Sequence, residues 1–179
     1  MIKVAIVGNI ASGKTTVEQM LIERGFKVYD TDKISHQILE SSDEVRQIFG
    51  TTDRKEIAKI VFSSKDKLKQ LESIIHPKVK EELEKIFAED LRVVFVSVPQ
   101  LFEAGFDVLF DKIIYITADE NIRLERLMKR NSLTIEEAQK RINAQQEVDK
   151  KEKSDFVIEN NSDIANLQMQ IEKVLSILI

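Results

Sequence analysis

Two kinds of hydrophobic pattern alternate along this chain. Short apolar runs rich in Val, Ile and Phe are typical of buried parallel strands, and the segments between them carry apolar residues every three or four positions, as amphipathic helices do. This alternation predicts an α/β fold with a parallel sheet built from βαβ units. The five predicted strands are Lys3–Val7, Lys27–Tyr29, Arg92–Val98, Lys112–Thr117 and Asp155–Ile158.

The interval from Asp32 to Asp90 departs from this alternation, because it carries helical spacing and no convincing strand pattern. Asp53, followed three residues later by Glu56, has the spacing of a capped helix start. His76 precedes Pro77, and a residue before proline is disfavoured in the helical region, so we expect the backbone to leave the helix there. The pattern predicts an all-helical insertion over residues 32–90, a natural cover for a second substrate.

A second helical region is predicted at residues 119–152. The segment Asp119–Asn131 places apolar residues on one face and arginines on another. Thr134 and Glu137 form a capping box for the next helix, which we expect to continue through Arg141 to Gln145. Two helices with an arginine rim predict a mobile lid over bound phosphates. The apolar residues of the first helix are Leu124, Leu127 and Met128, and its arginines are Arg123, Arg126 and Arg130.

The remaining segments, residues 1–31, 91–118 and 153–179, form the predicted core of a single domain. The last helix begins after Asp163 and carries apolar residues at core-facing spacing, so we expect it to pack on the sheet. These apolar residues are Ile164, Leu167, Ile171, Val174, Leu175 and Leu178.

The loop after the first strand carries the most specific motif. Residues Gly8–Thr15 match G-x-x-x-x-G-K-[ST] without a mismatch, between a predicted strand and a predicted helix, which is the context of a phosphate-binding loop. In such a loop, backbone N–H groups and the helix N-terminus cradle a polyphosphate. We expect Lys14 to reach the β- and γ-phosphates and the Thr15 hydroxyl to hold Mg²⁺.

Composition narrows the class of protein. The chain has 179 residues, of which 42% are hydrophobic and 32% charged, and this predicts a globular protein. A net charge of −4 argues against a non-specific nucleic-acid binder, and the lack of cysteine removes disulfides and thiolate metal sites. With no signal-peptide pattern and no apolar run long enough for a membrane span, we expect a cytoplasmic protein that binds neither nucleic acid nor membranes.

Neighbouring motifs discriminate among phosphate-loop proteins. A GTPase-type switch needs an N-K-x-D segment, and none occurs. A mechanical ATPase needs a strand that ends in an acidic residue, whereas the run Val93–Val98 is followed by Pro99 and Gln100. Asp30 and Asp32 do follow a strand, at the sheet edge where α/β proteins bind ligands. One of these two carboxylates can accept a proton from an attacking hydroxyl, and the other can support a Mg²⁺ shell. This arrangement favours a small-molecule kinase. Either carboxylate could instead cap the helix that follows.

Further motifs extend over nearly the whole chain. They are Gly8–Thr15, Asp30-x-Asp32, Asp53-Arg54, His76-Pro77, Val98-Pro99-x-Leu101-Phe102-Glu103, Arg141-x-x-x-Gln145 and Val157-Ile158-x-Asn160. In this order they resemble the dephospho-CoA kinase family, whose members transfer the γ-phosphoryl group of ATP to the ribose 3′-hydroxyl of dephospho-CoA, with Mg²⁺, in the last step of coenzyme A synthesis. The resemblance implies a three-layer P-loop kinase fold with a five-stranded parallel sheet, a helical CoA-side insertion and a lid.

The resemblance also implies roles for single residues. Asp32 matches the general base, while Lys14 and the lid residue Arg141 would stabilise charge on the transferred phosphoryl group. Arg123 and Arg126 fit an ordinary solvated helix face. The acceptor-side positions are Asp32, His76, Pro99 and Phe102. The positions matched to the nucleotide site are Gly8, Ala11, Ser12, Gly13, Lys14, Thr15, Thr16 and Asn160, with Asn160 near the adenine end of ATP. Arg130, on the first lid helix, is a further expected contact of the nucleotide, from the helix pattern and not from the resemblance.

The chain also departs from the family's pattern. Asn9 and Ala11 stand where the family usually has glycine, which predicts a stiffer phosphate loop. Gln100 replaces the usual leucine near the acceptor pocket, and the segment Ser41–Thr52 is shorter than is typical. These departures leave two alternatives open: a kinase for another small acceptor, such as a nucleoside, a nucleotide or a sugar acid, and a nucleotide-binding regulator without catalytic activity.

Overall fold

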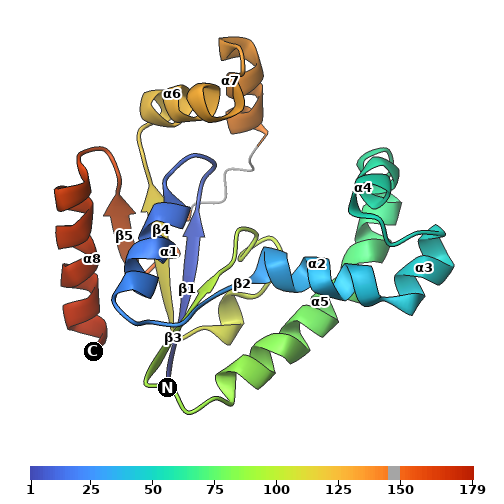
Figure 1. Ribbon diagram of the computed structural model, residues 1–179, viewed down its shortest axis with the longest axis horizontal. Coiled ribbons are helices and arrows are strands. Elements are labelled where there is room, and N and C mark those ends of the chain that lie inside the picture. Colours follow the sequence, from blue (N-terminus) through green and yellow to red (C-terminus); the bar gives the residue numbers. More distant parts are fainter. Residues whose placement is uncertain (145–149) are drawn as a thin grey trace. The chain divides into compact units, whose positions relative to one another are not determined.

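The computed structural model describes residues 1–144 and 150–179, and it shows two compact units (Figure 1). We call Met1–Tyr29 together with Leu91–Ile179 the core unit, and Asp30–Asp90 the helical unit. The elements of the core unit are β1 (Ile2–Gly8), α1 (Lys14–Glu23), β3 (Val93–Ser97), the short 3₁₀ helix η1 (Asp107–Leu109), β4 (Lys112–Thr117), α6 (Glu120–Asn131), α7 (Ile135–Asn143), β5 (Phe156–Glu159) and α8 (Ile164–Leu178). Strand β2 (Val28–Asp30) leads from the core unit into the helical unit.

The five strands form one parallel sheet in the order β2-β3-β1-β4-β5. The predicted α/β fold class is therefore confirmed, and each predicted strand is present with its ends shifted by no more than two residues. In the register of the sheet, Ile6 pairs with Ser97 on β3 and Gly8 pairs with Ile116 on β4. Because all strands are parallel, the loops after β1, β3, β4 and β5 lie at one edge, where ligands bind in α/β proteins.

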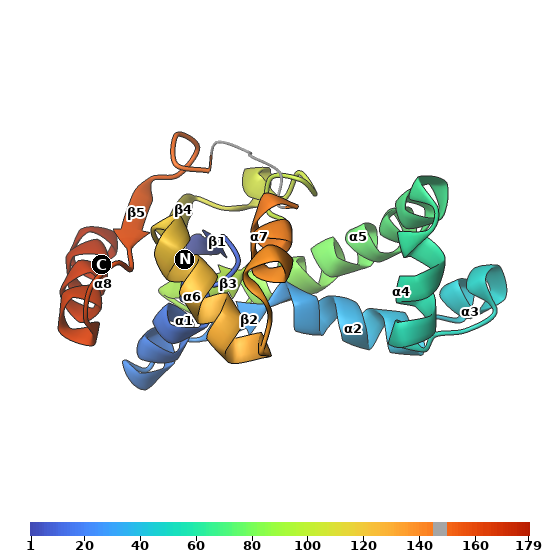
Figure 2. The ribbon, with the colours of Figure 1, turned by 90° about the horizontal axis from the view of Figure 1, so that it is seen from above.

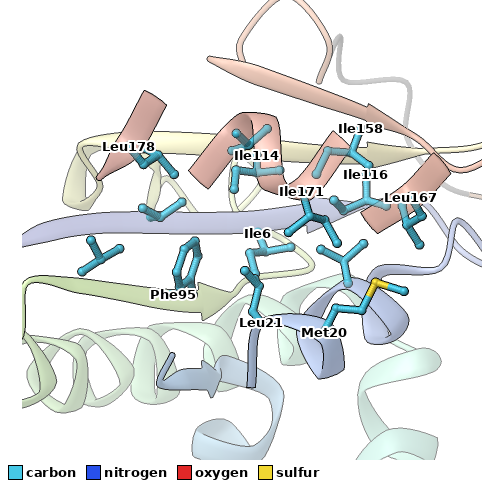
Figure 3. Close-up of a cluster of buried hydrophobic side chains, with 14 residues drawn as sticks. Ile6, Met20, Leu21, Phe95, Ile114, Ile116, Ile158, Leu167, Ile171 and Leu178 are labelled. Carbon is cyan, nitrogen blue, oxygen red and sulfur yellow. The ribbon is translucent and has the colours of Figure 1, made fainter. Parts of the chain in front are cut away.

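Helices α1 and α8 cover one face of the sheet and close a hydrophobic core there (Figure 3). Alternate strand residues such as Ile6, Phe95 and Ile116 point into this core and are fully buried. The predicted packing of α8 is confirmed for Leu167, Ile171, Val174 and Leu178, which are buried. The prediction is wrong for Ile164, the first residue of α8, which is 55% exposed; burial along this helix begins at Leu167.

An ion pair joins β4 to the residue directly before β5. Lys112 Nζ on β4 lies 2.7 Å from Asp155 Oδ1, and the backbone N–H of Ile113 donates to Asp155 Oδ2 at 2.9 Å. Burial by itself would raise the pKa of the Asp155 carboxyl, but the hydrogen bonds from Lys112 and Ile113 outweigh it and hold that pKa below its ordinary value. Asp155 therefore contributes as a carboxylate to the pairing of β4 with β5.

The helical unit contains α2 (Thr31–Ser41), α3 (Asp43–Phe49), α4 (Arg54–Phe62) and α5 (Lys65–Phe87). The predicted capped start at Asp53 is confirmed, because its side chain accepts from the N–H groups of Lys55 and Glu56. The unit's longest helix, α5, spans 23 residues and buries Ile74, Ile75, Val79 and Leu83.

The expected break at His76 is wrong, because His76 and Pro77 both lie inside α5. A proline in a helix removes one backbone hydrogen bond and crowds the carbonyl four residues earlier, at a cost of about 3 kcal/mol. Apolar residues are buried on both sides of the proline, Ile74 and Ile75 before it and Val79 after it. Their burial offsets this cost, since each fully buried side chain contributes about 1.5–3 kcal/mol.

In the part of the chain that the structure describes, no helix combines the length and hydropathy that a membrane crossing requires.

Candidate active site

The phosphate loop runs from the end of β1 to the start of α1, and its two motif glycines are enclosed. A Cβ on Gly8 would lie 2.8 Å from Ser12 Oγ and 2.9 Å from the carbonyl oxygen of Ile116. Gly13 has φ +94°, and a Cβ there would lie 2.0 Å from Nδ2 of Asn160. Both positions therefore require glycine, Gly8 for space and Gly13 for space and backbone conformation.

The loop presents donors to an anion. The first N–H groups of a helix have no acceptor within the helix, and the helix dipole adds partial positive charge at that end. Helix α1 begins at Lys14, and its first turn contains no acidic residue that would cancel this charge. Thr15 is exposed at this end, whereas Ser12 is buried with its Oγ lacking a hydrogen-bond partner in the described chain. The geometry fits a polyphosphate at the N-terminus of α1.

The tip of the loop packs against the two helices predicted to form the lid. Ile10 and Ala11 contact the apolar cluster of Leu127, Ala138 and Ile142, which joins α6 to α7. Figures 1 and 2 both show α6 lying over the loop between β1 and α1. Ala11 has φ +60°, a left-handed conformation that costs a non-glycine residue roughly 1–2 kcal/mol. The contacts with α6 and α7 are what holds Ala11 in this conformation.

A buried asparagine directly after β5 supports the loop. Asn160 is 8% exposed, and its Nδ2 donates to the carbonyl oxygen of Ser12 at 2.9 Å. Arg126 on α6 donates to the Asn160 carbonyl at 3.0 Å and to the Ser12 carbonyl at 3.5 Å. These contacts join α6, β5 and the loop, so the loop is held by elements far away in the sequence.

The expectation that Arg123 and Arg126 form a solvated face of α6 is wrong. Arg123 is 8% exposed, with no hydrogen-bond partner for its Nε in the described chain, and Arg126 contacts the loop. Arg123 lies one turn before Leu127, so the two share a face of the helix. When Leu127 packs against the loop, the same contact buries Arg123.

Lys14 has two partners in the core unit. Its Nζ donates to Glu18 Oε1 at 2.8 Å and to the hydroxyl of Ser97, a fully buried residue at the end of β3. Sequence reasoning missed both. The four-residue spacing of Lys14 and Glu18 on one helix was a usable signal for the first, whereas the contact with Ser97 required knowledge of strand order.

The two arginines favoured as lid residues are placed on the lid helices but not at the loop. Arg130, on α6, is exposed and its Nε donates to Asn131 Oδ1 at 3.0 Å. Arg141, on α7, is also exposed. The predicted capping box of Thr134 and Glu137 at the start of α7 is confirmed. Gln145, where the second lid helix was expected to end, lies outside the described residues.

The turn after β3 holds the predicted acceptor residues of the core unit. Pro99 and Phe102 are both half-buried, and Lys153 Nζ lies 5.4 Å from the centroid of the Phe102 ring. Lys150 is buried, with its Nζ 3.7 Å from Glu103 Oε1. Two cations from the segment before β5 therefore contact this turn.

The remaining predicted residues lie in the helical unit. Asp30 is the N-cap of α2, and its Oδ1 accepts from the N–H of Asp32 at 2.8 Å. Asp30 therefore takes the capping role that was weighed for both carboxylates. Asp32 is exposed in the first turn of α2, and His76 is half-buried in the middle of α5.

Comparisons with known proteins identify the family and support the fold. A family model described as dephospho-CoA kinase matches residues 2–166. A protein of Fusobacterium nucleatum named dephospho-CoA kinase is 39% identical, over 95% of both chains. The crystal structure of TT1252 from Thermus thermophilus superposes with a TM-score of 0.86 at 32% identity, over 99% of this chain and 98% of that one. A dephospho-CoA kinase structure from Campylobacter jejuni gives a TM-score of 0.75 at 31% identity, over 97% and 95% of the two chains.

Proposed function

Because the chain belongs to the dephospho-CoA kinase family, we propose that it transfers the γ-phosphoryl group of ATP to the ribose 3′-hydroxyl of dephospho-CoA, which yields coenzyme A. The observation that carries this proposal is the family match over residues 2–166 together with an intact phosphate loop. The P-loop kinase fold, with its five-stranded parallel sheet, is the framework on which that loop lies.

ATP occupies the loop in this proposal, with its phosphates at the N-terminus of α1. Lys14 stabilises the charge that develops on the transferred phosphoryl group, as a positioned cation does in phosphoryl transfer. Ser12, Gly13 and Thr16 belong to the backbone that surrounds the phosphates. Asn160 acts by holding the Ser12 carbonyl, which keeps the neighbouring N–H groups in place.

Magnesium is part of the proposal, and Thr15 would hold it. The Thr15 side chain is exposed at the start of α1 and makes no hydrogen bond within the described chain, so its hydroxyl is available to a cation there. No cluster of three or more His, Asp or Glu side chains that could hold a metal occurs among the described residues. Mg²⁺ is usually bound through few protein oxygens plus substrate phosphates and water. When bound, Mg²⁺ neutralises phosphate charge.

Asp32 is the proposed general base, and it would take the proton from the attacking 3′-hydroxyl. A carboxylate suits this task because it accepts a hydrogen bond from the hydroxyl and orients it for attack. His76, Pro99 and Phe102 are the proposed acceptor contacts. Arg130 and Arg141 are the proposed lid cations, which would approach the phosphates when the lid helices move.

The test is phosphorylation of dephospho-CoA by the purified protein with ATP and Mg²⁺. The expected product is coenzyme A, identified by mass and by the position of the new phosphate. Lys14→Ala serves as the control, because it should lower kcat/KM by a factor of about 10² or more if the cation stabilises the transferred group.

A panel of nucleosides, nucleotides and sugar acids, run in parallel, tests the acceptor. Turnover of one of these in place of dephospho-CoA would contradict the proposed acceptor. ATP binding without transfer to any acceptor would contradict the proposed enzyme activity.

A further inference from the structure

The ammonium group of Lys14 lies between a carboxylate and a hydroxyl. Glu18 Oε1 accepts from Lys14 Nζ at 2.8 Å, and Ser97 Oγ accepts from the same nitrogen. The side chains of Lys14 and Glu18 are only 19% and 13% exposed. An ammonium group has three donors, so within the described chain these contacts use two and leave a third for a ligand.

Strand β3 provides no carboxylate at its end, where it meets Lys14. In many phosphate-loop proteins the strand beside the loop ends in an acidic residue that faces the bound metal and phosphates. Here β3 ends at Ser97, and the next three residues are Val98, Pro99 and Gln100. A hydroxyl therefore stands at the strand end, and the carboxylate that meets Lys14 comes from α1.

We infer that Glu18 is a positioning residue for Lys14 and supplies from α1 the negative charge that β3 lacks, an inference that rests on the proposed kinase activity. A lysine side chain has four flexible bonds, so a free Lys14 would sample many positions. Glu18, one helical turn away, and Ser97, on the neighbouring strand, hold the ammonium from two sides. Lys14 is then oriented toward the loop before ATP arrives, which lowers the entropic cost of contacting the phosphates.

The burial of this pair separates it from ordinary surface ion pairs. Arg46 and Asp43 form a similar helical pair at 3.3 Å, but their side chains are 59% and 86% exposed. Exposed ion pairs contribute little interaction energy because water screens their charges, whereas two charges shielded from water attract each other more strongly. Glu18 is thus able to restrain Lys14 in a way that an exposed carboxylate on α1 does not.

Kinetics of Glu18→Gln test this role. The variant keeps the shape of the side chain and removes its charge. We expect kcat to fall roughly tenfold, as for a loss of a hydrogen bond to a charged group, with KM for ATP within about twofold of the wild type. Glu23→Gln is the matched control, because Glu23 is an exposed carboxylate near the end of the same helix, and its Oε1 accepts from Gln19 and not from Lys14 within the described chain.

Moving the charge gives a second test. Ser97→Asp in the Glu18→Gln background places a carboxylate on the other side of Lys14 and should restore most of the lost kcat. A structural defect in α1 would not be repaired by a change on β3. Equal kcat for Glu18→Gln and the wild type would overturn the inference. So would a lower KM for ATP with unchanged kcat, because Glu18 would then merely compete with phosphate for Lys14.

A spectroscopic test separates this inference from the proposed function. In the wild type without ligand, the side-chain ammonium signal of Lys14 should be protected from exchange with water, with Lys14→Met assigning the signal. Glu18→Gln should abolish that protection, whatever acceptor the enzyme uses. Protection that survives in Glu18→Gln would overturn the inference even if dephospho-CoA is phosphorylated. Loss of protection without coenzyme A synthesis would contradict the proposed function and leave the positioning supported.

Discussion

Gly13 has two separate reasons to be glycine. Its φ of +94° lies in the left-handed region, and the space beside its Cα is filled by Asn160 Nδ2. Gly25 shares the first property, with φ +85°, but no atom lies within 4 Å of an added Cβ. The chain thus offers a matched pair of glycines in which backbone strain and steric conflict can be measured separately.

We predict that Gly25→Ala lowers the free energy of unfolding by about 1–2 kcal/mol, the cost of a left-handed non-glycine residue. Gly13→Ala should cost a further ~1–3 kcal/mol, because Asn160 must move and the buried hydrogen bond to Ser12 is lost. Urea unfolding measures both values. Equal losses for the two variants would show that the contact with Asn160 contributes nothing.

Asp32 provides a second prediction for a single residue. If it is the general base, Asp32→Asn should lower kcat by about 10²–10⁴ while ATP binding, measured by calorimetry, stays unchanged. Glu40→Gln, an exposed change near the end of the same helix, is the control. An Asp32→Asn enzyme with nearly normal kcat would remove Asp32 from the mechanism.

At the scale of the element, α6 connects the lid region to the phosphate loop. Its apolar residue Leu127 packs with Ile10 and Ala11, and its Arg126 donates to two backbone carbonyls of the site. Strands β4 and β5 are in turn joined by Asp155, whose contacts with Lys112 and Ile113 cross between them. The placement of Asn160 follows from this pairing, because it is the residue immediately after β5.

The lowered pKa of Asp155 predicts a pH dependence of stability. A carboxyl whose folded-state pKa lies below its ordinary value of 3.8 stabilises the fold above that value, and this contribution is lost as the pH falls through the folded-state pKa. The melting temperature of Asp155→Asn should therefore lie below the wild-type value near neutral pH, with the difference shrinking in acid. Asp90→Asn, at an exposed position, should show no such convergence. A difference that is constant with pH would contradict a charged role for Asp155.

At the scale of the whole molecule, the phosphate loop and its supports belong to one unit and the proposed base to the other. The core unit holds Lys14, Asn160 and Arg126, and the helical unit holds Asp32 and His76. ATP binding is therefore expected to stabilise the core unit without requiring the acceptor.

We predict that ATP with Mg²⁺ at 100 times its dissociation constant raises the melting temperature by roughly 5–10 °C. This follows from about 2.7 kcal/mol of binding stabilisation and about 2–4 °C per kcal/mol for a chain of this size. Differential scanning fluorimetry measures the shift. Lys14→Ala should show a smaller shift at the same ATP concentration, and an unchanged shift would mean that Lys14 does not contact bound ATP.

Much of the fold could be predicted because strands and helix caps depend on residues close together in the chain. The alternation of apolar residues located all five strands, and the capping patterns at Asp53 and Thr134 located two helix starts. The prediction that the backbone leaves the helix before a proline failed at His76 and Pro77, because apolar burial on both sides of the proline maintains the helix. The prediction of a solvated face failed at Arg123, because the burial of a residue on α6 depends on which other elements pack against that helix.

The phosphate loop was recognisable from the sequence by itself, since its glycines, lysine and threonine are fixed by a motif of eight consecutive residues. The sequence also determined the family to which the chain belongs. Only the tertiary structure decided which groups hold that loop. Ser97 meets Lys14 across 83 residues and Asn160 meets Ser12 across 148, and such contacts arise from strand order and packing, which no local pattern encodes.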